Sequence, residues 1–186
     1  MYIADIWTNS NGNQNMNNPQ DIHNVIQGDF HLYEEAFAKA LQSDNPLLSE
    51  VLDYVHSKQG KQLRPILVLL SAALCRGVTP KSIQTAVALE LMHTASLIHD
   101  DVVDDSPLRR GSQSVHSLWN NKIAVLVGDY LLTRVIDILA ELRNVTILNI
   151  SAQMSASLAS GELLQLHSGE SMWISEAQYN QVIRQK

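Results

Sequence analysis

The chain has 186 residues, of which 45% are hydrophobic, and this length and composition suit one globular domain with a substantial core. Nineteen acidic and thirteen basic residues give a formal net charge of -6, and the basic residues are scattered along the sequence. This scatter excludes the basic patch by which proteins bind nucleic acid, so a phosphate-bearing ligand has to be held by a local group of cations.

The sequence gives no sign of a membrane span or of a disulfide. The longest strongly apolar run, residues 65–75, is about half as long as the ~20 residues that cross a bilayer. The first residues lack a basic region followed by an apolar stretch, so we expect a cytoplasmic protein. The single cysteine, Cys75, has no internal partner, and its apolar neighbours predict a buried, unreactive thiol.

The chain changes character near residue 25. Residues 8–20 are almost wholly polar and rich in Asn, which predicts a mobile leader over 1–24. From residue 25 onward, apolar residues recur at intervals of three and four, which predicts one all-α domain over 25–186. The expected helices span residues 30–41, 46–58, 64–75, 80–105, 120–142, 145–167 and 176–186.

Several of these helices carry recognisable start and stop signals. Asn45 is suited to cap the second helix, with Pro46 at its first position. The pair Ser106 and Pro107 is expected to end the long helix that starts near Pro80, and Ser175 to cap the last helix.

The segment "LIHDDVVDDSPLRRG", residues 97–111, places four aspartates at the end of an apolar helix. Asp100 and Asp104 are four residues apart, as are Asp101 and Asp105, so each pair is expected on one helix face. Like charges at this spacing, at the helix end that disfavours anions, predict a bound cation. Mg²⁺ suits such a place, because it takes one or two carboxylates and completes its shell with water and phosphate oxygens. For the aspartates alone, a solvated acidic helix end is the alternative.

The segment "GKQLRP", residues 60–65, places Lys61 and Arg64 three residues apart at the start of an apolar helix. The helix dipole disfavours cations there, so both side chains are expected to face one bound anion. Solvated charges that cap a core helix are the alternative.

Four motifs, "GKQLRP", "LIHDDVVDDSPLRRG", "GDYLL" (128–132) and "GELLQL" (161–166), resemble those of the trans-type polyprenyl diphosphate synthases in order and approximate spacing. The resemblance extends over residues 26–186. It implies the isoprenoid-synthase-type fold, an all-α bundle around a central cavity with Mg²⁺ at the mouth. It also implies a homodimer.

The resemblance implies a role for each matching residue. Asp100 and Asp104 match the metal-binding carboxylates of the first aspartate-rich motif, with Asp101 supporting them. Arg109 matches a contact to an allylic diphosphate, as does Lys186. The positions that match substrate-binding residues, most of them for isopentenyl diphosphate, are Gly60, Lys61, Arg64, His93, Arg109, Arg110 and Gln165.

The implied reaction suits these residue types. An allylic diphosphate ionises when the charge of the departing pyrophosphate is stabilised, which Asp-held Mg²⁺ and Arg109 can do in a dry site. Holding isopentenyl diphosphate alongside brings the reacting carbons together. The small side chains of Ala95 and Ser96, five and four residues before Asp100, leave room for a growing tail and predict a medium- or long-chain product. Close helix packing is the alternative for this pair.

The sequence departs from the family by stopping before a second aspartate-rich motif. We expect a fragment of a longer synthase, truncated at the C-terminus and incomplete or inactive by itself. A natural short protein that binds diphosphates is another explanation, and a chain completed by a second subunit is a third.

Three other functions remain open. An HD-type metal phosphohydrolase is suggested by the adjacent His99 and Asp100, with His93 upstream. A terpene cyclase shares an aspartate-rich motif but needs no isopentenyl site. A non-catalytic or regulatory subunit of a heteromeric synthase has no evident need for Asp100, Asp104 and the arginine pair.

Overall fold

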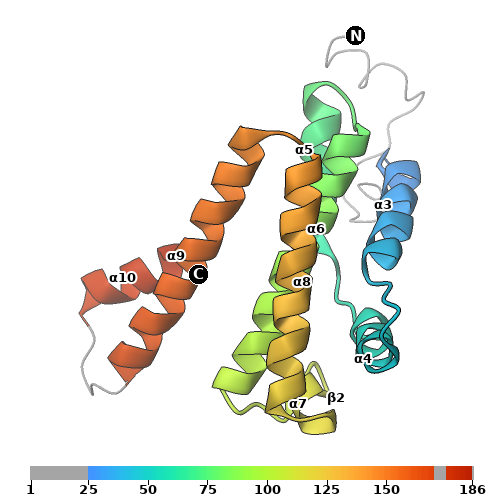
Figure 1. Ribbon diagram of the computed structural model, residues 1–186. Coiled ribbons are helices and arrows are strands. Elements are labelled where there is room, and N and C mark those ends of the chain that lie inside the picture. The colour runs from blue at the N-terminus through green and yellow to red at the C-terminus, as the bar shows by residue number, and fades with distance from the viewer. Residues whose placement is uncertain (1–24, 170–174, 186) are drawn as a thin grey trace, which may run out of the picture. The chain divides into compact units, whose positions relative to one another are not determined.

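A computed structural model of the chain describes residues 25–169 and 175–185 (Figure 1). The predicted leader, 1–24, and Lys186 lie outside the described residues. The described part is all-α, as predicted, with one short two-stranded ribbon. Its elements are α3 (Gln27–Ala40), α4 (Pro46–Ser57), α5 (Leu63–Cys75), α6 (Pro80–Val103), β1 (Leu108–Arg109), β2 (Ser112–Gln113), α7 (Val115–Leu118), α8 (Asn121–Glu141), α9 (Val145–Gly169) and α10 (Glu176–Gln185).

The described residues divide into two compact units, the first ending at Leu142 and the second beginning at Arg143. In the first unit α6 is the central helix, and it packs against α8, α5 and α3. Figure 1 shows α8 running alongside α6. Apolar side chains from five helices are fully buried around it, and each large one contributes about 1.5–3 kcal/mol relative to exposure. They include Tyr33, Phe37, Val51, Leu52, Leu69, Val87, Leu91 and Leu131.

The start of α4 follows its predicted capping signal, and α8 has a cap of the same kind. The Asn45 side chain accepts a hydrogen bond from the Leu48 amide at 3.1 Å, and Pro46 is the first residue of α4. Asn120 caps α8 in the same way through the Ile123 amide, also at 3.1 Å. Such caps satisfy amides that have no partner within the helix, which is why short polar residues begin these helices.

The end of α6 differs from its prediction and changes the geometry of the aspartates. The helix ends at Val103, followed by Asp104 as its C-cap and Asp105 in the left-handed region (φ 47°). The Ser106 amide donates to the Asp101 carbonyl at 2.9 Å, and the Asp105 amide to the Val102 carbonyl at 3.3 Å. These two bonds form a Schellman motif. Asp105 therefore does not share a helix face with Asp101, whereas Asp100 and Asp104 remain one turn apart.

The start of α5 also corrects a prediction. Gln62 has a left-handed backbone (φ 48°, ψ 40°), and the helix begins only at Leu63. Lys61 therefore lies in the connection before the helix and does not share a helix face with Arg64. At the other end of α5, Cys75 is exposed, so the prediction of a buried thiol was wrong. Leu74 beside it is exposed as well, because the last turn of α5 lies outside the core.

The second unit consists of α9 and α10, which pack against each other. Ser175 caps α10 as predicted: its hydroxyl accepts from the Gln178 amide at 3.2 Å, and the Gln178 side chain accepts from the Ser175 amide at 2.9 Å. Val182 of α10 is buried, while Leu163 and Leu166 of α9 are exposed. None of the described helices is long and apolar enough to cross a bilayer.

Candidate functional site

The arginine pair that follows the aspartates forms a tight hairpin. Strands β1 and β2 pair antiparallel, with Leu108 opposite Gln113 and Arg109 opposite Ser112. Arg110 and Gly111 are the two turn residues, and both have positive φ, at 52° and 80°. A two-residue turn of this kind matches the twist of the strands, and glycine accommodates it freely. For the non-glycine residue Arg110, this left-handed conformation costs about 1–3 kcal/mol, and such strained residues are often found at functional sites.

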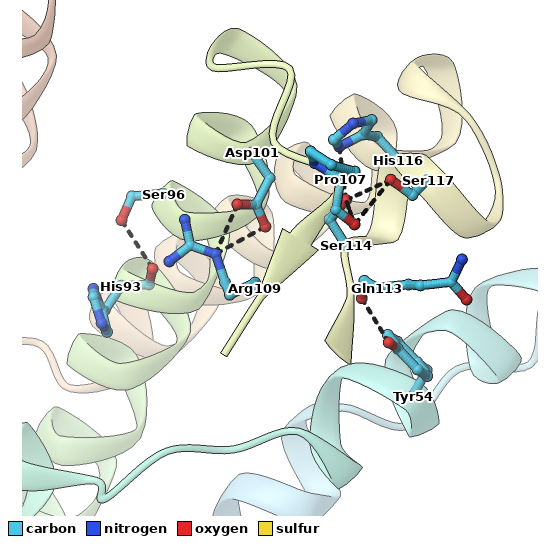
Figure 2. Close-up of polar contacts among 10 residues, drawn as sticks. All are labelled: Tyr54, His93, Ser96, Asp101, Pro107, Arg109, Gln113, Ser114, His116 and Ser117. Atoms are coloured by element: carbon cyan, nitrogen blue, oxygen red, sulfur yellow. Dashed lines mark hydrogen bonds and ion pairs between the residues drawn. The ribbon is translucent and has the colours of Figure 1, made fainter. Parts of the chain in front are cut away.

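Side chains on either side hold the hairpin in place. The Pro107 carbonyl accepts hydrogen bonds from the Ser114 amide at 3.0 Å, the Ser114 hydroxyl at 3.2 Å and the Ser117 hydroxyl at 3.1 Å. Tyr54 of α4 donates its hydroxyl to the Gln113 carbonyl at 2.6 Å (Figure 2). The hairpin is thereby joined to the start of α7 and to α4.

A buried ion pair fixes the first arginine of the hairpin. Asp101 is only 4% exposed, and both of its carboxylate oxygens accept from Arg109 Nε at 2.8 Å. Figure 2 shows the Arg109 side chain reaching α6 at Asp101. The charge of Asp101 thus neutralises one of the protein's own arginines, and the hairpin is tied to the last turn of α6.

The second arginine of the hairpin covers the segment before α5. A β-carbon on Gly60 would overlap the guanidinium of Arg110, so the two groups are in direct contact. Both line a cavity of about 300 Å³. Its wall on α6 includes Glu90 and His93, one turn apart, together with Asp101 two to three turns further on.

Burial and charge determine the protonation of the groups on this wall. Burial, and to a lesser extent the neighbouring charges of Arg64, Arg110 and Arg109, together lower the pKa of His93 from 6.5 to about 4. His93 is therefore neutral near pH 7. Burial also raises the pKa of the Glu90 carboxyl, against the opposing effect of Arg64 and Arg110. Three arginines from α5 and the hairpin thus act on one neutral imidazole, and two of them, Arg64 and Arg110, also act on one buried carboxyl.

The structure brings together five of the residues that the sequence predicts for substrate binding. Gly60, His93, Arg109 and Arg110 line the cavity, and Arg64 acts electrostatically on its wall. Lys61 is exposed and is not one of the described residues that line the cavity. Gln165 lies on α9 in the second unit, and Lys186 lies outside the described residues. Their roles stay predictions.

The predicted chain-length residues lie on another part of α6. Ala95 is fully buried, and the Ser96 hydroxyl donates to the His93 carbonyl at 2.8 Å. Neither residue lines the cavity described above. Ala95 is tightly enclosed in the core, which matches the packing alternative, and a role in product length stays a prediction.

Asp100 and Asp104 can supply some of the ligands of a divalent metal ion. Asp100 is half-buried and Asp104 is exposed, and the Asp104 amide donates to the Asp100 carbonyl at 2.8 Å. Within the described residues, no three His, Cys, Asp or Glu side chains are grouped to hold a metal ion by themselves. Two carboxylates with water and phosphate oxygens are a donor set that Mg²⁺ accepts. Both carboxylate oxygens of Asp101 are engaged by Arg109.

His99, which suggested a metal phosphohydrolase, faces α8. Its Nε2 lies 3.1 Å from the Val125 carbonyl and 3.6 Å from the Asp129 carboxylate. The ring also lies against Gly128, where a β-carbon would overlap it. Gly128 belongs to the "GDYLL" motif, so in this structure the glycine allows close packing of α6 and α8. The contacts of His99 favour a packing role over metal ligation.

Among the residues that line the cavity, sequence reasoning missed Glu90 and Tyr54. Glu90 is the one acidic residue in the apolar stretch 86–99 and comes three residues before His93, so its spacing could have revealed it. Tyr54 lies among ordinary helix positions and carries no comparable signal. Its contact with Gln113 depends on residues 59 positions apart in the chain.

Comparisons with known proteins agree with these motifs. A family model described as "Polyprenyl synthetase" matches residues 45–186. An all-trans-nonaprenyl-diphosphate synthase of Rhodobacter capsulatus is 38% identical over 168 residues, which are 90% of this chain and 52% of the relative. Component 2 of a heptaprenyl diphosphate synthase from Geobacillus stearothermophilus is 36% identical over 145 residues, 78% of this chain and 45% of the relative.

The fold is shared with solved structures as well. The crystal structure of a polyprenyl synthase from Caulobacter crescentus, complexed with calcium and isoprenyl diphosphate, matches with a TM-score of 0.86 and 31% identity. The match covers 94% of this chain and 53% of that one. The chain thus spans about half the length of the relatives it matches. From its motifs, its fold and the family match over most of its length, the chain belongs to the polyprenyl synthetase family.

Proposed function

We propose that this chain supplies the diphosphate-binding part of a prenyltransferase that condenses isopentenyl diphosphate with an allylic diphosphate. The observation that carries the proposal is the Arg109–Arg110 hairpin, which follows the aspartates directly and lies over Gly60 beside His93. A diphosphate is a compact anion, and clustered guanidinium groups at the edge of a cavity match its charge and geometry.

The residues divide into two groups by position. Arg64 and Arg110, with neutral His93 as a hydrogen-bonding group, form the subsite for isopentenyl diphosphate, and Gly60 leaves room for the Arg110 guanidinium. Lys61 and Gln165 are proposed as further contacts. Arg109, held by Asp101, faces the allylic diphosphate, with Lys186 as a second contact. Holding both diphosphates beside each other orients the reacting carbons and removes much of the entropic barrier.

Asp100 and Asp104 are proposed to hold Mg²⁺, with Asp101 supporting them through Arg109. When bound, the ion supplies charge stabilisation to the departing pyrophosphate. The Caulobacter structure is a complex with calcium and isoprenyl diphosphate, which supports a divalent cation together with a diphosphate in this fold.

The product is proposed to be a medium- or long-chain polyprenyl diphosphate, with Ala95 and Ser96 as chain-length residues. The name of the Rhodobacter relative, a nonaprenyl-diphosphate synthase, supports a long product. A homodimer in the cytoplasm is proposed for the complete enzyme. A second candidate is one subunit of a heteromeric synthase, which the name "component 2" of the Geobacillus relative favours.

The test is an assay with labelled isopentenyl diphosphate, an allylic diphosphate and Mg²⁺. It compares the 186-residue chain with a version extended by the second half of a homologous synthase, and with the same extended version carrying Asp100→Asn. We expect labelled polyprenyl product from the extended version and a rate that is lower by at least about 100-fold from the Asp100→Asn form. Absence of product from the extended version would contradict the proposal. Product that forms only after a second, different subunit is added would favour the heteromeric synthase.

A further inference from the structure

Glu90 is a buried charged group of the cavity wall that neither the sequence motifs nor the proposed function accounts for. The residue is 8% exposed and lines the cavity one helical turn before His93. Its Oε2 atom is buried and has no hydrogen-bond partner within the described structure. A buried carboxylate oxygen without a partner is costly and uncommon in native proteins, so its retention requires an explanation.

The charges around Glu90 explain why the residue is retained. Arg110 lines the same cavity as Glu90, and the charges of Arg64 and Arg110 act on the Glu90 carboxyl from separate parts of the chain, the start of α5 and the turn of the hairpin. Arg109 has its own counter-charge in Asp101. Glu90 is therefore the acidic wall residue available to the other two arginines, whose side chains are long and belong to exposed residues.

Long exposed arginine side chains lose considerable rotational freedom when a ligand orders them. A fixed carboxylate on the rigid wall of α6 can hold their guanidinium groups toward the cavity before a ligand arrives. We propose that Glu90 is a positioning residue that acts through Arg64 and Arg110 to preorganise the diphosphate subsite. This inference rests on the proposed function and adds a residue to its machinery.

Two physical effects of Glu90 on anion binding have opposite signs, which makes the proposal testable. As a bare negative charge beside an anion site, Glu90 would weaken binding, and its neutralisation would tighten it. As a positioning residue it strengthens binding, because the arginines are ordered in advance. The measured direction of change therefore separates the two effects.

The experiment is calorimetric titration of the 186-residue chain with inorganic pyrophosphate in the absence of magnesium, so that the aspartates contribute little. Glu90→Gln keeps the shape of the side chain and removes its charge. The matched control is Glu50→Gln, an exposed residue of α4 that changes the net charge equally. We expect Glu90→Gln to raise the Kd for pyrophosphate about tenfold and Glu50→Gln to leave it within about twofold.

Thermal unfolding provides the readout that separates positioning from structural support. We expect the Tm of Glu90→Gln to equal or exceed that of the unchanged chain, since the substitution removes a buried charge whose Oε2 has no hydrogen bond. If circular dichroism shows that Glu90→Gln is unfolded, Glu90→Asp is measured instead. It retains the charge but withdraws it by one methylene, and we expect a Kd about threefold higher.

The outcomes are distinct. Unchanged or tighter pyrophosphate binding by the folded Glu90 variant, with binding by the unchanged chain intact, overturns the positioning role and leaves the proposed function standing. Absence of pyrophosphate binding by the unchanged chain, both with and without magnesium, contradicts the proposed function and the role of Glu90 together.

Discussion

The guanidinium of Arg110 lies directly against the α-carbon of Gly60, in the space that a β-carbon would occupy. Gly60→Ala therefore has to displace Arg110 from the cavity edge. We expect the Kd for pyrophosphate to rise about tenfold, the loss of one charge-assisted contact, with little change in Tm because Gly60 and Arg110 are both exposed.

Gly28→Ala provides the matched control for that substitution. Gly28 lies in the first turn of α3, and a β-carbon there would meet nothing within 4 Å. Alanine at this position should stabilise the helix by about 0.5–1 kcal/mol and leave pyrophosphate binding unchanged. Equal affinity of the Gly60→Ala and Gly28→Ala variants would show that the contact with Arg110 does not matter for binding.

The ion pair between Asp101 and Arg109 predicts a large loss of stability on Asp101→Asn. The carboxylate is buried, and the substitution leaves Arg109 without its counter-charge. Complete burial of such a pair would predict a loss of about 3–5 kcal/mol, but the Arg109 side chain is 35% exposed, so we expect about 2 kcal/mol. Urea denaturation monitored by circular dichroism measures the change.

Asp137→Asn controls for the removal of an aspartate as such. Asp137 pairs with Arg134 at 3.3 Å on the surface of α8, and its side chain is 56% exposed. A surface pair of this kind contributes less than about 1 kcal/mol. A loss for Asp101→Asn no greater than for Asp137→Asn would mean that the buried pair adds nothing to stability.

Tyr54→Phe should loosen the arginine hairpin without removing any charge. The variant loses the 2.6 Å hydrogen bond to the Gln113 carbonyl, and we expect the free energy of unfolding to fall by about 1 kcal/mol. Amide hydrogen exchange in residues 108–113 should become faster, since this bond ties the hairpin to α4. Tyr130→Phe, which loses a 3.4 Å bond to the Gln42 carbonyl, should leave exchange in the hairpin unchanged. The same exchange rate in both variants would refute the anchoring role of Tyr54.

The parts of this site that could be predicted are those set by spacing along one helix or by a local capping signal. His93 and Asp101 lie along the same wall of α6 because of helical periodicity, and Asn45 caps α4 because its own side chain reaches the next turn. The two mistaken placements, Lys61 and Asp105, both depend on a single residue with a left-handed backbone. Gln62 interrupts the approach to α5, and Asp105 itself ends α6. Non-glycine residues rarely adopt this conformation, so neither placement had a clear signal in the sequence.

Contacts between distant segments were beyond prediction for a different reason. The arginine pair was expected in a loop, and the hairpin depends on Arg110 adopting a positive φ beside Gly111. Its attachment to Tyr54 and Gly60 brings together residues about 50 positions or more apart, whose proximity no local pattern encodes. The motif "LRRG" therefore predicted which residues belong to the site, whereas their arrangement became clear only in the fold.

The pKa of His93 predicts how stability depends on pH. Burial and the charges of Arg64, Arg110 and Arg109 lower it from 6.5 to about 4 in the folded chain. Between pH 6.5 and 4, His93 is therefore protonated in the unfolded chain but stays neutral in the folded chain. The free energy of unfolding consequently falls as the pH falls. Because the ring is only half-buried, we expect this residue to account for about 1–2 kcal/mol over that range.

Denaturation of the unchanged chain and of His93→Gln at several pH values measures this contribution. The variant should lose less stability than the unchanged chain between pH 6.5 and 4, while the effect of the carboxylates is common to both. The same pH dependence in the two proteins would show that His93 takes up its proton equally in the folded and unfolded states.

Gly128→Ala tests whether the glycine of "GDYLL" serves packing between α6 and α8. Alanine has the higher helix propensity by about 0.5–1 kcal/mol, so stabilisation is expected if the position is unconstrained. Here the added β-carbon would overlap the His99 ring, and overpacking of this kind costs about 1–3 kcal/mol. We therefore expect a net loss of about 1–2 kcal/mol in urea denaturation. In the background of His99→Ala, where the ring is absent, Gly128→Ala should instead be neutral or stabilising, because the two substitutions share one contact and are not additive. If Gly128→Ala lowers the free energy of unfolding equally in both backgrounds, contact with His99 is not the reason that a glycine is needed at position 128.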